Sequence, residues 1–391
     1  MSDATTTRLI HHDYEPPAGF AAPQVAVYKA STVLFPSVAA MRARDWREKK
    51  GYTYGLHGTP TTFTLEERIA TLEGGTQTVL TPSGLAAVAL VSQALLEQGD
   101  EVLLPANVYA PSRELARQEL ARWGVTHRFY DPLDAESLRR TIGPRTRLLW
   151  VEAPGSVTME FPDLRALVAA GRAQGVTVAL DNTWGAGIAF KPFELGVDIV
   201  MQALTKYPSG GGDVLMGSVT TRDPNLHERI KLSHMRLGLG VGANDAESVL
   251  RSLPTLALRY ATQDEAGRRL ACWFAQQNAV AQVLHPALEG SPGHAHWKAH
   301  CTAAAGLFSV VFKERHTALQ VDAFIDALRL FRIGYSWAGP MSLAVPYDLQ
   351  LMRGAERPAH LQGHLVRFSV GLEDVDDLQA DLSQALSVAG L

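Results

Sequence analysis

An acid and a lysine follow two consecutive apolar runs of the chain. Asp181 is the last residue of the run 177–181, and Lys206 comes shortly after the run 198–202. Continuous short apolar runs are typical of parallel strands that are buried on both faces. Ligands of open α/β sheets bind beyond the carboxyl ends of such strands. We therefore expect Asp181 and Lys206 to share one site.

Three glycines, residues 210–212, follow the lysine closely. A single lysine is most often a solvated surface group, but glycines beside it allow a bulky or anionic group to approach the backbone. An unprotonated lysine amine attacks carbonyl groups and forms Schiff bases. Together with an acid that keeps a pyridine nitrogen protonated, Lys206 indicates pyridoxal phosphate (PLP) chemistry, in which the ring withdraws electrons from Cα.

PLP also requires an anion site for its phosphate and a flat surface against its ring. Residues 81–85, Thr-Pro-Ser-Gly-Leu, end a predicted strand and begin an apolar helix. The N–H groups of Gly84 and Leu85 would then lie at a helix N-terminus, where phosphate binds. Tyr109, just beyond the apolar run 101–105, is the candidate for the ring. Each signal alone is weak, but their order along the chain favours a PLP site.

The pattern between about residues 65 and 220 alternates between short apolar runs and amphipathic stretches. Strand predictions fall on 78–82, 101–105, 147–154, 177–181 and 198–202, and helix predictions on 84–97, 112–122 and 163–174. This alternation predicts βαβ units and an α/β fold with a mostly parallel sheet flanked by helices. A second alternation runs from 306–313 to 364–382. We expect an arm at 1–50 that contacts a neighbouring subunit, a large PLP-binding domain at 51–250, and a smaller C-terminal α/β domain at 251–391.

Composition excludes several classes of protein. The formal net charge is −4 and 19% of residues are charged, so we expect neither a nucleic-acid partner nor a membrane-surface binder. Two cysteines do not make a disulfide scaffold. No apolar stretch is long enough to span a bilayer, and the first residues lack a secretory pattern, so we expect a cytoplasmic enzyme. The histidines at 294, 296 and 300 fit a polar surface segment better than a metal site, and we expect no metal.

The chain resembles the Cys/Met-metabolism family of PLP-dependent enzymes, which has the aspartate-aminotransferase-like fold (fold type I). The resemblance runs from about residue 25 to the C-terminus. The segments that carry it are 52–75, 153–164, 181–187, 203–217, 285–294, 335–343 and 366–378. Within the family the chain is most similar to members that cleave the thioether cystathionine by β-elimination.

The resemblance implies a role for each candidate residue. Lys206 would hold PLP and then move the Cα proton, and Asp181 would pair with the pyridine nitrogen. Arg367 would bind the substrate α-carboxylate, because a planar guanidinium meets a carboxylate with two parallel hydrogen bonds. The remaining implied contacts are ring stacking by Tyr109, phosphate binding by Gly84, Leu85 and Thr205, a contribution to phosphate and catalysis by Tyr54 of the neighbouring subunit, and substrate contacts by Ser336 and Trp337.

Three residues depart from the family pattern. Leu56 occupies the place of an arginine that binds phosphate across the dimer, and His57 after it is a pH-dependent cation. Gly211 occupies the place of a histidine, and Met341 that of a glutamate. The first departure concerns the phosphate contacts and the third concerns substrate choice. None of them replaces Lys206 or Asp181, so the PLP chemistry is still expected.

Other functions remain open at this point. The chain could act at Cγ, as cystathionine γ-synthase, cystathionine γ-lyase or methionine γ-lyase do, although Trp337 and Ala203 resemble the β-acting members. It could also be a cysteine desulfhydrase, or a regulatory protein that keeps the fold without turnover. The resemblance further implies a homotetramer built from two dimers, with active sites at the dimer interfaces.

Overall fold

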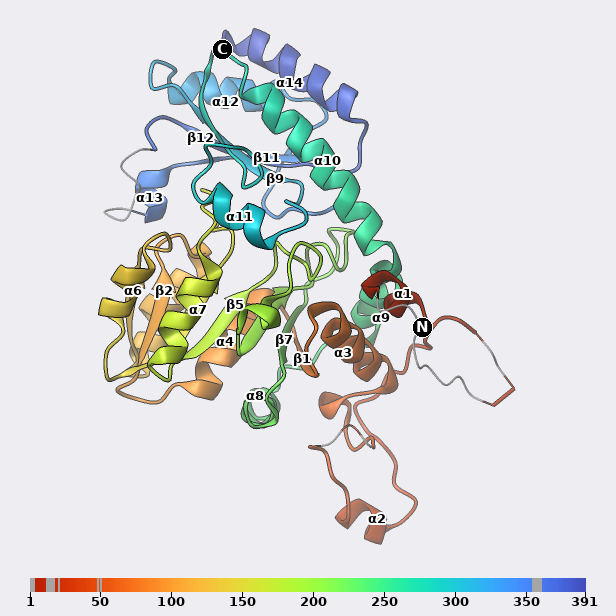
Figure 1. Ribbon diagram of the computed structural model, residues 1–391. Coiled ribbons are helices and arrows are strands. Elements are labelled where there is room, and N and C mark those ends of the chain that lie inside the picture. Colours follow the sequence, from red (N-terminus) through yellow and green to blue (C-terminus); the bar gives the residue numbers. More distant parts are fainter. Residues whose placement is uncertain (1–3, 12–17, 20–21, 48, 50, 354–360) are drawn as a thin grey trace.

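The computed structural model describes residues 4–11, 18–19, 22–47, 49, 51–353 and 361–391. Two β-sheets form its core, and Figure 1 shows them one above the other, joined along helix α10 (Leu256–Phe274). The larger sheet has seven strands in the order β1-β7-β6-β5-β4-β2-β3. The smaller has five in the order β10-β11-β12-β9-β8.

The strands of the larger sheet run the same way except for β7, which is antiparallel to both of its neighbours. These strands are β1 (Gln77–Thr81), β2 (Glu101–Pro105), β3 (Thr126–Tyr130), β4 (Thr146–Glu152), β5 (Thr177–Asp181), β6 (Ile199–Ala203) and β7 (Gly217–Thr221). The carboxyl ends of β4, β5 and β6 therefore meet at one edge of the sheet, where a ligand site is expected.

Helices cover both faces of this sheet. Alternate residues of the buried strands point to opposite faces, so Leu149 and Val151 of β4 join one apolar cluster and Leu148 and Trp150 the other. The first face carries α3 (Pro60–Glu73), α6 (Ala135–Thr141) and α7 (Leu164–Ala173); the second carries α4 (Gly84–Leu95), α5 (Ala110–Glu114), the π-helix Leu115–Leu120 and α8 (Pro224–Leu237).

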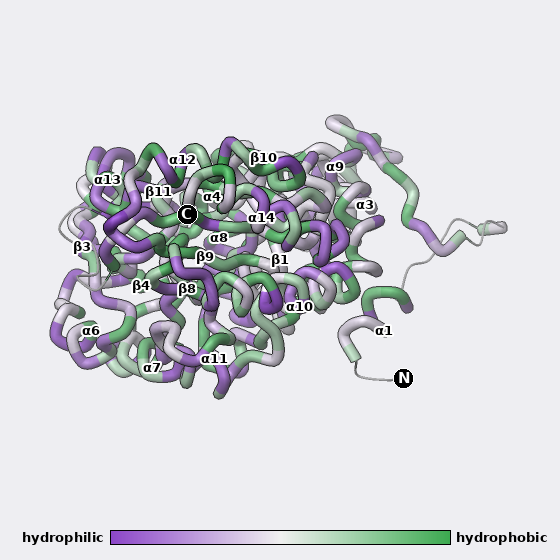
Figure 2. Tube along the Cα trace, turned by 90° about the horizontal axis from the view of Figure 1, so that it is seen from above, coloured by the Kyte–Doolittle hydropathy of each residue, from purple (hydrophilic) through white to green (hydrophobic). Residues whose placement is uncertain are grey.

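The smaller sheet is mostly antiparallel and packs against α10, α12 (Ala318–Asp326) and α14 (Val375–Ala389). Its strands are β8 (Val280–Leu284), β9 (Leu307–Phe312), β10 (Arg332–Ile333), β11 (Leu343–Tyr347) and β12 (Leu365–Ser369). Figure 2 shows hydrophobic residues concentrated along central strands such as β9. The other helices are α9 (Ala243–Ser252), α11 (His294–His300) and α13 (Leu349–Arg353), with 3₁₀ turns at Gly55–His57, Pro192–Leu195 and Leu253–Thr255.

Part of the N-terminal segment lies away from the rest of the chain. Helix α1 (Thr5–Ile10) packs against α3, whereas α2 (Val38–Arg42) projects from the body. Leu34, between them, is 89% exposed. The expected contact of this segment with a neighbouring subunit stays a prediction. In the described part of the chain, no helix is long and apolar enough to cross a membrane.

The α/β fold with a mostly parallel sheet is confirmed. The predicted strands at 101–105 and 177–181 coincide with β2 and β5, and the predicted helix at 163–174 corresponds to α7. The predicted helix at 112–122 is instead divided into α5 and a π-helical stretch. Five strands, β3, β7, β8, β10 and β11, were not predicted from the pattern.

Candidate active site

Two acids lie side by side at the edge of the larger sheet. Asp181 ends β5, Glu152 ends β4, and they are register partners. Asp181 Oδ1 accepts the N–H of Thr183 at 2.9 Å. Burial raises the pKa of Asp181. The hydrogen bonds from Thr183 and the positive charge of Lys206 lower it, but by less. Burial and the neighbouring Asp181 charge raise the pKa of Glu152 well above its usual range. Burial therefore favours the protonated form of Glu152 relative to a carboxyl group in water.

Lys206 lies in the turn after β6 and connects the two sheets. Its Nζ donates a hydrogen bond to Ser336 Oγ at 2.6 Å and lies 5.5 Å from the centre of the Trp337 ring. Burial and the nearby charge of Arg367 lower the pKa of Lys206 to about 8. About a tenth of its amine is therefore unprotonated and nucleophilic at pH 7, far more than for a lysine in water.

Arg367 occupies the middle of β12 and lines the same cavity as Asp181. Its Nη2 donates to the Ser336 carbonyl at 3.0 Å, and the guanidinium lies 5.5 Å from the Tyr347 ring centre. The residue is 6% exposed. In the described part of the chain its buried Nε has no hydrogen-bond partner. A buried donor without a partner is costly, and a substrate carboxylate would satisfy it.

The N-terminus of α4 faces the same cavity. Ser83 Oγ caps the helix by accepting the Ala86 N–H at 3.1 Å, and Gly84 and Leu85 occupy the first helical turn, where N–H groups have no acceptor within the helix. A Cβ on Gly84 would lie 2.7 Å from Ala203 Cβ, so only glycine fits without movement. The Thr205 hydroxyl bonds both the carbonyl and the N–H of Met216, at 3.2 and 3.1 Å.

Tyr109 stands at the start of α5 and is anchored through its backbone. Its N–H donates to Glu152 Oε2 at 2.8 Å. Burial and the charges of Asp181 and Glu152 raise the pKa of the phenol, so it stays protonated. Sequence reasoning missed Glu152, which stands within the predicted strand 147–154; the only signal was its place next to the strand end.

A cavity of about 450 Å³ brings most of the predicted site residues together. Its walls include Gly84, Leu85, Tyr109, Glu152, Asp181, Thr205, Lys206, Ser336, Trp337 and Arg367. Tyr54 does not belong to these walls: it precedes the 3₁₀ turn Gly55–His57 and is 48% exposed. Within one chain, the structure does not bring Tyr54 to the other predicted residues.

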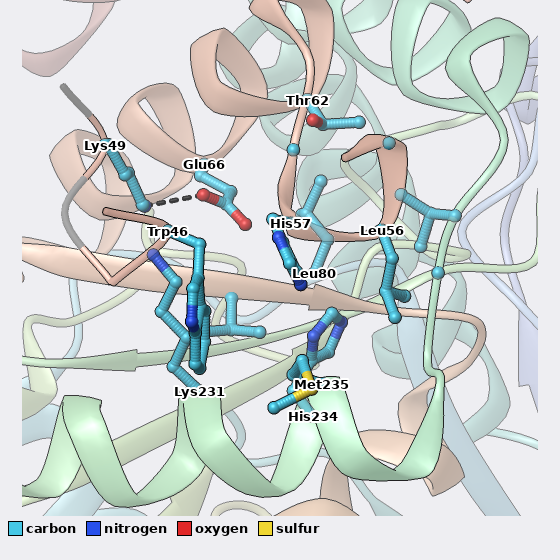
Figure 3. Close-up of a pocket in the computed structure, with 15 residues that line it drawn as sticks. Trp46, Lys49, Leu56, His57, Thr62, Glu66, Leu80, Lys231, His234 and Met235 are labelled. Atoms are coloured by element: carbon cyan, nitrogen blue, oxygen red, sulfur yellow. Dashed lines mark ion pairs between the residues drawn. The ribbon is translucent and has the colours of Figure 1, made fainter. Parts of the chain in front are cut away.

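Leu56 and His57 line a separate pocket on their own chain. Figure 3 shows them above α8, close to His234 and Met235, with the Lys49–Glu66 ion pair at the other end. His57 Nδ1 bonds Thr53 Oγ1 at 2.8 Å. Burial and the charges of Lys231 and His234 lower the pKa of His57. His57 is therefore largely uncharged at neutral pH in this position.

The structure shows the surroundings of the other two departures, and nothing in it explains the methionine at position 341. A Cβ on Gly211 would collide with the Asp213 carboxylate, so a side chain there requires Asp213 to move. Met341 is 53% exposed. The next residue, Ser342, is buried and held by Glu373, which accepts its N–H at 2.7 Å and its hydroxyl at 2.8 Å.

This donor set fits PLP. A buried lysine of lowered pKa faces a buried acid, a helix N-terminus is available for a phosphate, and the Nε of Arg367 is available for a carboxylate. The profile of the family described as Cys/Met metabolism PLP-dependent enzymes matches residues 6–387. The chain belongs to this family. Its cofactor is PLP, and it is an enzyme of Cys/Met metabolism.

Similar proteins have related names. A putative cystathionine beta-lyase from Rhizobium johnstonii is 39% identical over 98% of this chain and 96% of its own length. The cystathionine beta-lyase MetC of Escherichia coli is 37% identical over 91% of each chain. The crystal structure of MetB from Corynebacterium glutamicum matches with a TM-score of 0.89 and 27% identity over 98% of each chain.

Proposed function

We propose that this chain is a carbon–sulfur lyase that cleaves L-cystathionine by β-elimination. The products are homocysteine, pyruvate and ammonia. The observation that carries the proposal is the Lys206–Ser336–Arg367 arrangement, which sets a nucleophilic amine beside a carboxylate-binding guanidinium in the cavity that Asp181 also lines. The names of the relatives at 37–39% identity support the choice of substrate.

Each residue has a defined task in this reaction. When bound, PLP supplies the carbonyl carbon that takes up the substrate amine and a ring that withdraws electrons from Cα. Asp181 keeps the pyridine nitrogen protonated, because a buried carboxylate stabilises a cation beside it. The backbone N–H groups of Gly84 and Leu85 bind the phosphate. Tyr109, held by Glu152, covers the ring.

Arg367 and Lys206 act on the substrate itself. Arg367 binds the α-carboxylate and so fixes the orientation of Cα. Lys206 Nζ takes the Cα proton, and the Cβ–S bond breaks with its electron pair leaving on sulfur. The proton held by Lys206 then passes to this thiolate, which is released as homocysteine. The remaining enamine takes up water and gives pyruvate and ammonia. Ser336, which contacts both Lys206 and Arg367, holds the base and the carboxylate site in one geometry.

A purified holoenzyme tests the proposal directly. L-cystathionine should yield pyruvate and homocysteine in equal amounts. Production of 2-oxobutyrate would instead show cleavage at Cγ, and sulfide release from cysteine at a higher kcat/KM than that for cystathionine would show a desulfhydrase. A cofactor absorption band without turnover of any of these substrates would favour a regulatory protein. The Trp337 indole beside Lys206 supports the first outcome, because the γ-acting members resemble this chain less at that position.

We further propose that the active site is completed by a second copy of this chain. Tyr54 is exposed and lies outside its own cavity, and Leu215, a cavity wall residue, is 72% exposed. In a homodimer the second chain would cover Tyr54 and Leu215. Two such dimers would form the tetramer. Mixing inactive Lys206→Ala and Tyr54→Ala chains should restore activity, since one of the two sites in a mixed dimer is then intact. No recovery after subunit exchange would place Tyr54 outside the active site.

A further inference from the structure

A buried acid outside the cavity links the strands that carry the proposed catalytic residues. Glu73 is the last residue of α3 and is 1% exposed. Its Oε2 accepts a hydrogen bond from Asn182 Nδ2 at 2.7 Å, and its Oε1 accepts one from Gln202 Nε2. Asn182 and Gln202 are both fully buried. Asn182 directly follows Asp181 at the end of β5, and Gln202 lies in β6, close before Lys206.

The position of Glu73 lowers the stability of the folded chain. An acid at the carboxyl end of a helix opposes the helix dipole, and burial of a carboxylate costs free energy unless it is compensated. Two amide donors and the nearby charge of Lys191 provide compensation. Lys191 Nζ also donates to the Leu72 and Gly187 carbonyls, at 3.0 and 2.6 Å. A buried polar network of this kind holds its members in one geometry.

We propose that Glu73 is a positioning residue for the reaction: its carboxylate ties Asn182 to Gln202 and so fixes Asp181 and Lys206 relative to each other. A second link runs alongside, because the Ala203 N–H donates to Thr183 Oγ1 at 2.9 Å. Glu73 touches neither substrate nor cofactor in this scheme. Its removal should therefore lower kcat while leaving the substrate KM nearly unchanged.

Titration of Glu73 gives a signal that does not depend on turnover. Burial raises the pKa of Glu73 to about 7, and the charge of Asp181 adds to this, while Asn182, Lys191 and Gln202 oppose it. Burial and the charge of Arg8 in α1 lower the pKa of Lys191, and the charge of Glu73 raises it. Since the folded chain binds the proton more tightly than the unfolded chain, this group makes stability fall as pH rises from about 4.5 through 7.

Three variants test the proposal, which rests on the proposed lyase activity only for its kinetic part. Glu73→Ala in the holoenzyme should lower kcat about 10- to 100-fold with KM changed less than about threefold. It should also shift the pH midpoint of the cofactor absorption band.

Glu73→Gln should retain most of kcat, because the Asn182 or Gln202 amide, whose oxygens lack partners in the described part of the chain, can turn to accept its new N–H. Glu101→Gln is the control, since Glu101 is a buried acid at the amino end of β2, bonded to Arg128 and Thr146.

The outcomes separate a positioning role from a structural one. Wild-type kcat and an unchanged cofactor band in Glu73→Ala would overturn the proposal, as would equal losses in the Glu101→Gln control. Urea unfolding of the apo chain at pH 5 and pH 8 provides the independent reading. Between pH 5 and pH 8, the Glu73→Gln variant should lose less unfolding free energy than the wild type does. An equal loss in the two proteins would show that Glu73 is not the buried ionising group. If the wild type lacks lyase activity, the cofactor band and the unfolding curves still decide the question.

Discussion

Lys206 Nζ and Ser336 Oγ are 2.6 Å apart although they belong to different sheets. Lys206 follows β6 of the larger sheet, and Ser336 precedes β11 of the smaller one. Ser336 has a positive φ of 86°, an uncommon conformation for a residue with a side chain. Strain of this kind persists where the surrounding structure holds it, often at functional sites. Relative movement of the two sheets would therefore separate the proposed base from the carboxylate site.

Replacement of Lys206 by alanine should abolish turnover. The amine that binds the cofactor and moves the Cα proton is lost, whereas the helix α4 N-terminus and Asp181 remain to bind PLP non-covalently. The measurements are pyruvate formation and resistance of the bound cofactor to dialysis. Lys298→Ala, which removes an exposed lysine of α11, is the control. Activity near that of the wild type in Lys206→Ala would refute the proposed mechanism.

Incorporation of PLP into the apo chain should depend on pH through Lys206. Only the unprotonated amine attacks a carbonyl, and its pKa is about 8, so the rate should rise through that pH. Arg367→Leu removes a positive charge that lowers this pKa, and the midpoint should move to higher pH. Stopped-flow absorbance over pH 6 to 10 measures both curves. Arg268→Leu, whose arginine pairs with Asp264, should leave the midpoint unchanged.

Arg367→Leu should also raise KM for cystathionine sharply. Loss of one partner of a desolvated arginine–carboxylate pair costs about 2–5 kcal/mol, which corresponds to a fall in kcat/KM of roughly 30- to 5000-fold. Steady-state kinetics of the holoenzyme measure it, with cofactor content as the control for folding. An unchanged kcat/KM would assign Arg367 to a structural role beside Tyr347.

The two neighbouring acids should respond differently to the same chemical change. Asp181→Asn removes the charge that keeps the pyridine nitrogen protonated and should reduce kcat severely. Glu152→Gln should reduce it by less than about threefold, because burial favours the protonated form of Glu152 and an amide oxygen can still accept the Tyr109 N–H, a bond of about 1 kcal/mol. Comparable losses in both variants would show that Glu152 acts as an anion.

Leu56→Arg should tighten PLP binding if the side chain reaches the partner subunit's cofactor. A hydrogen bond to a charged group contributes about 1–3 kcal/mol, and neutral His57 supplies no cation in its place. Titration of the apo variant against the apo wild type gives the difference. Equal or weaker affinity would show that residue 56 remains in its own pocket beside Gly240.

The sequence was most informative where the centre of a strand is apolar. The central residues of β2 and β5 are apolar and buried and gave clear signals, whereas β3 has alternating burial and β7 consists largely of small and polar residues. In β7 the buried Thr220 hydroxyl is satisfied by Thr78 across the sheet. Such pairing depends on register, which a single sequence does not contain.

The residues proposed to bind the cofactor could be predicted from the sequence, but the residues that hold them in place could not. Asp181 and Lys206 could be found because strand ends converge at one edge of a parallel sheet. Glu152 and Glu73 could not, since their partners, the Tyr109 N–H and the Asn182 amide, come from distant parts of the chain. The proposed contribution of Tyr54 to the active site of a neighbouring subunit stays a prediction.

The contact between Gly84 and Ala203 has a consequence for how this enzyme can change. Because a Cβ at position 84 would lie within 2.7 Å of Ala203 Cβ, the two residues share one volume between α4 and β6. A library that varies one position at a time would therefore find position 84 intolerant of every other residue. Joint randomisation with position 203 is the way to recover new side chains at the phosphate end of the pocket, and mutational tolerance measured singly would underestimate what this fold can accept.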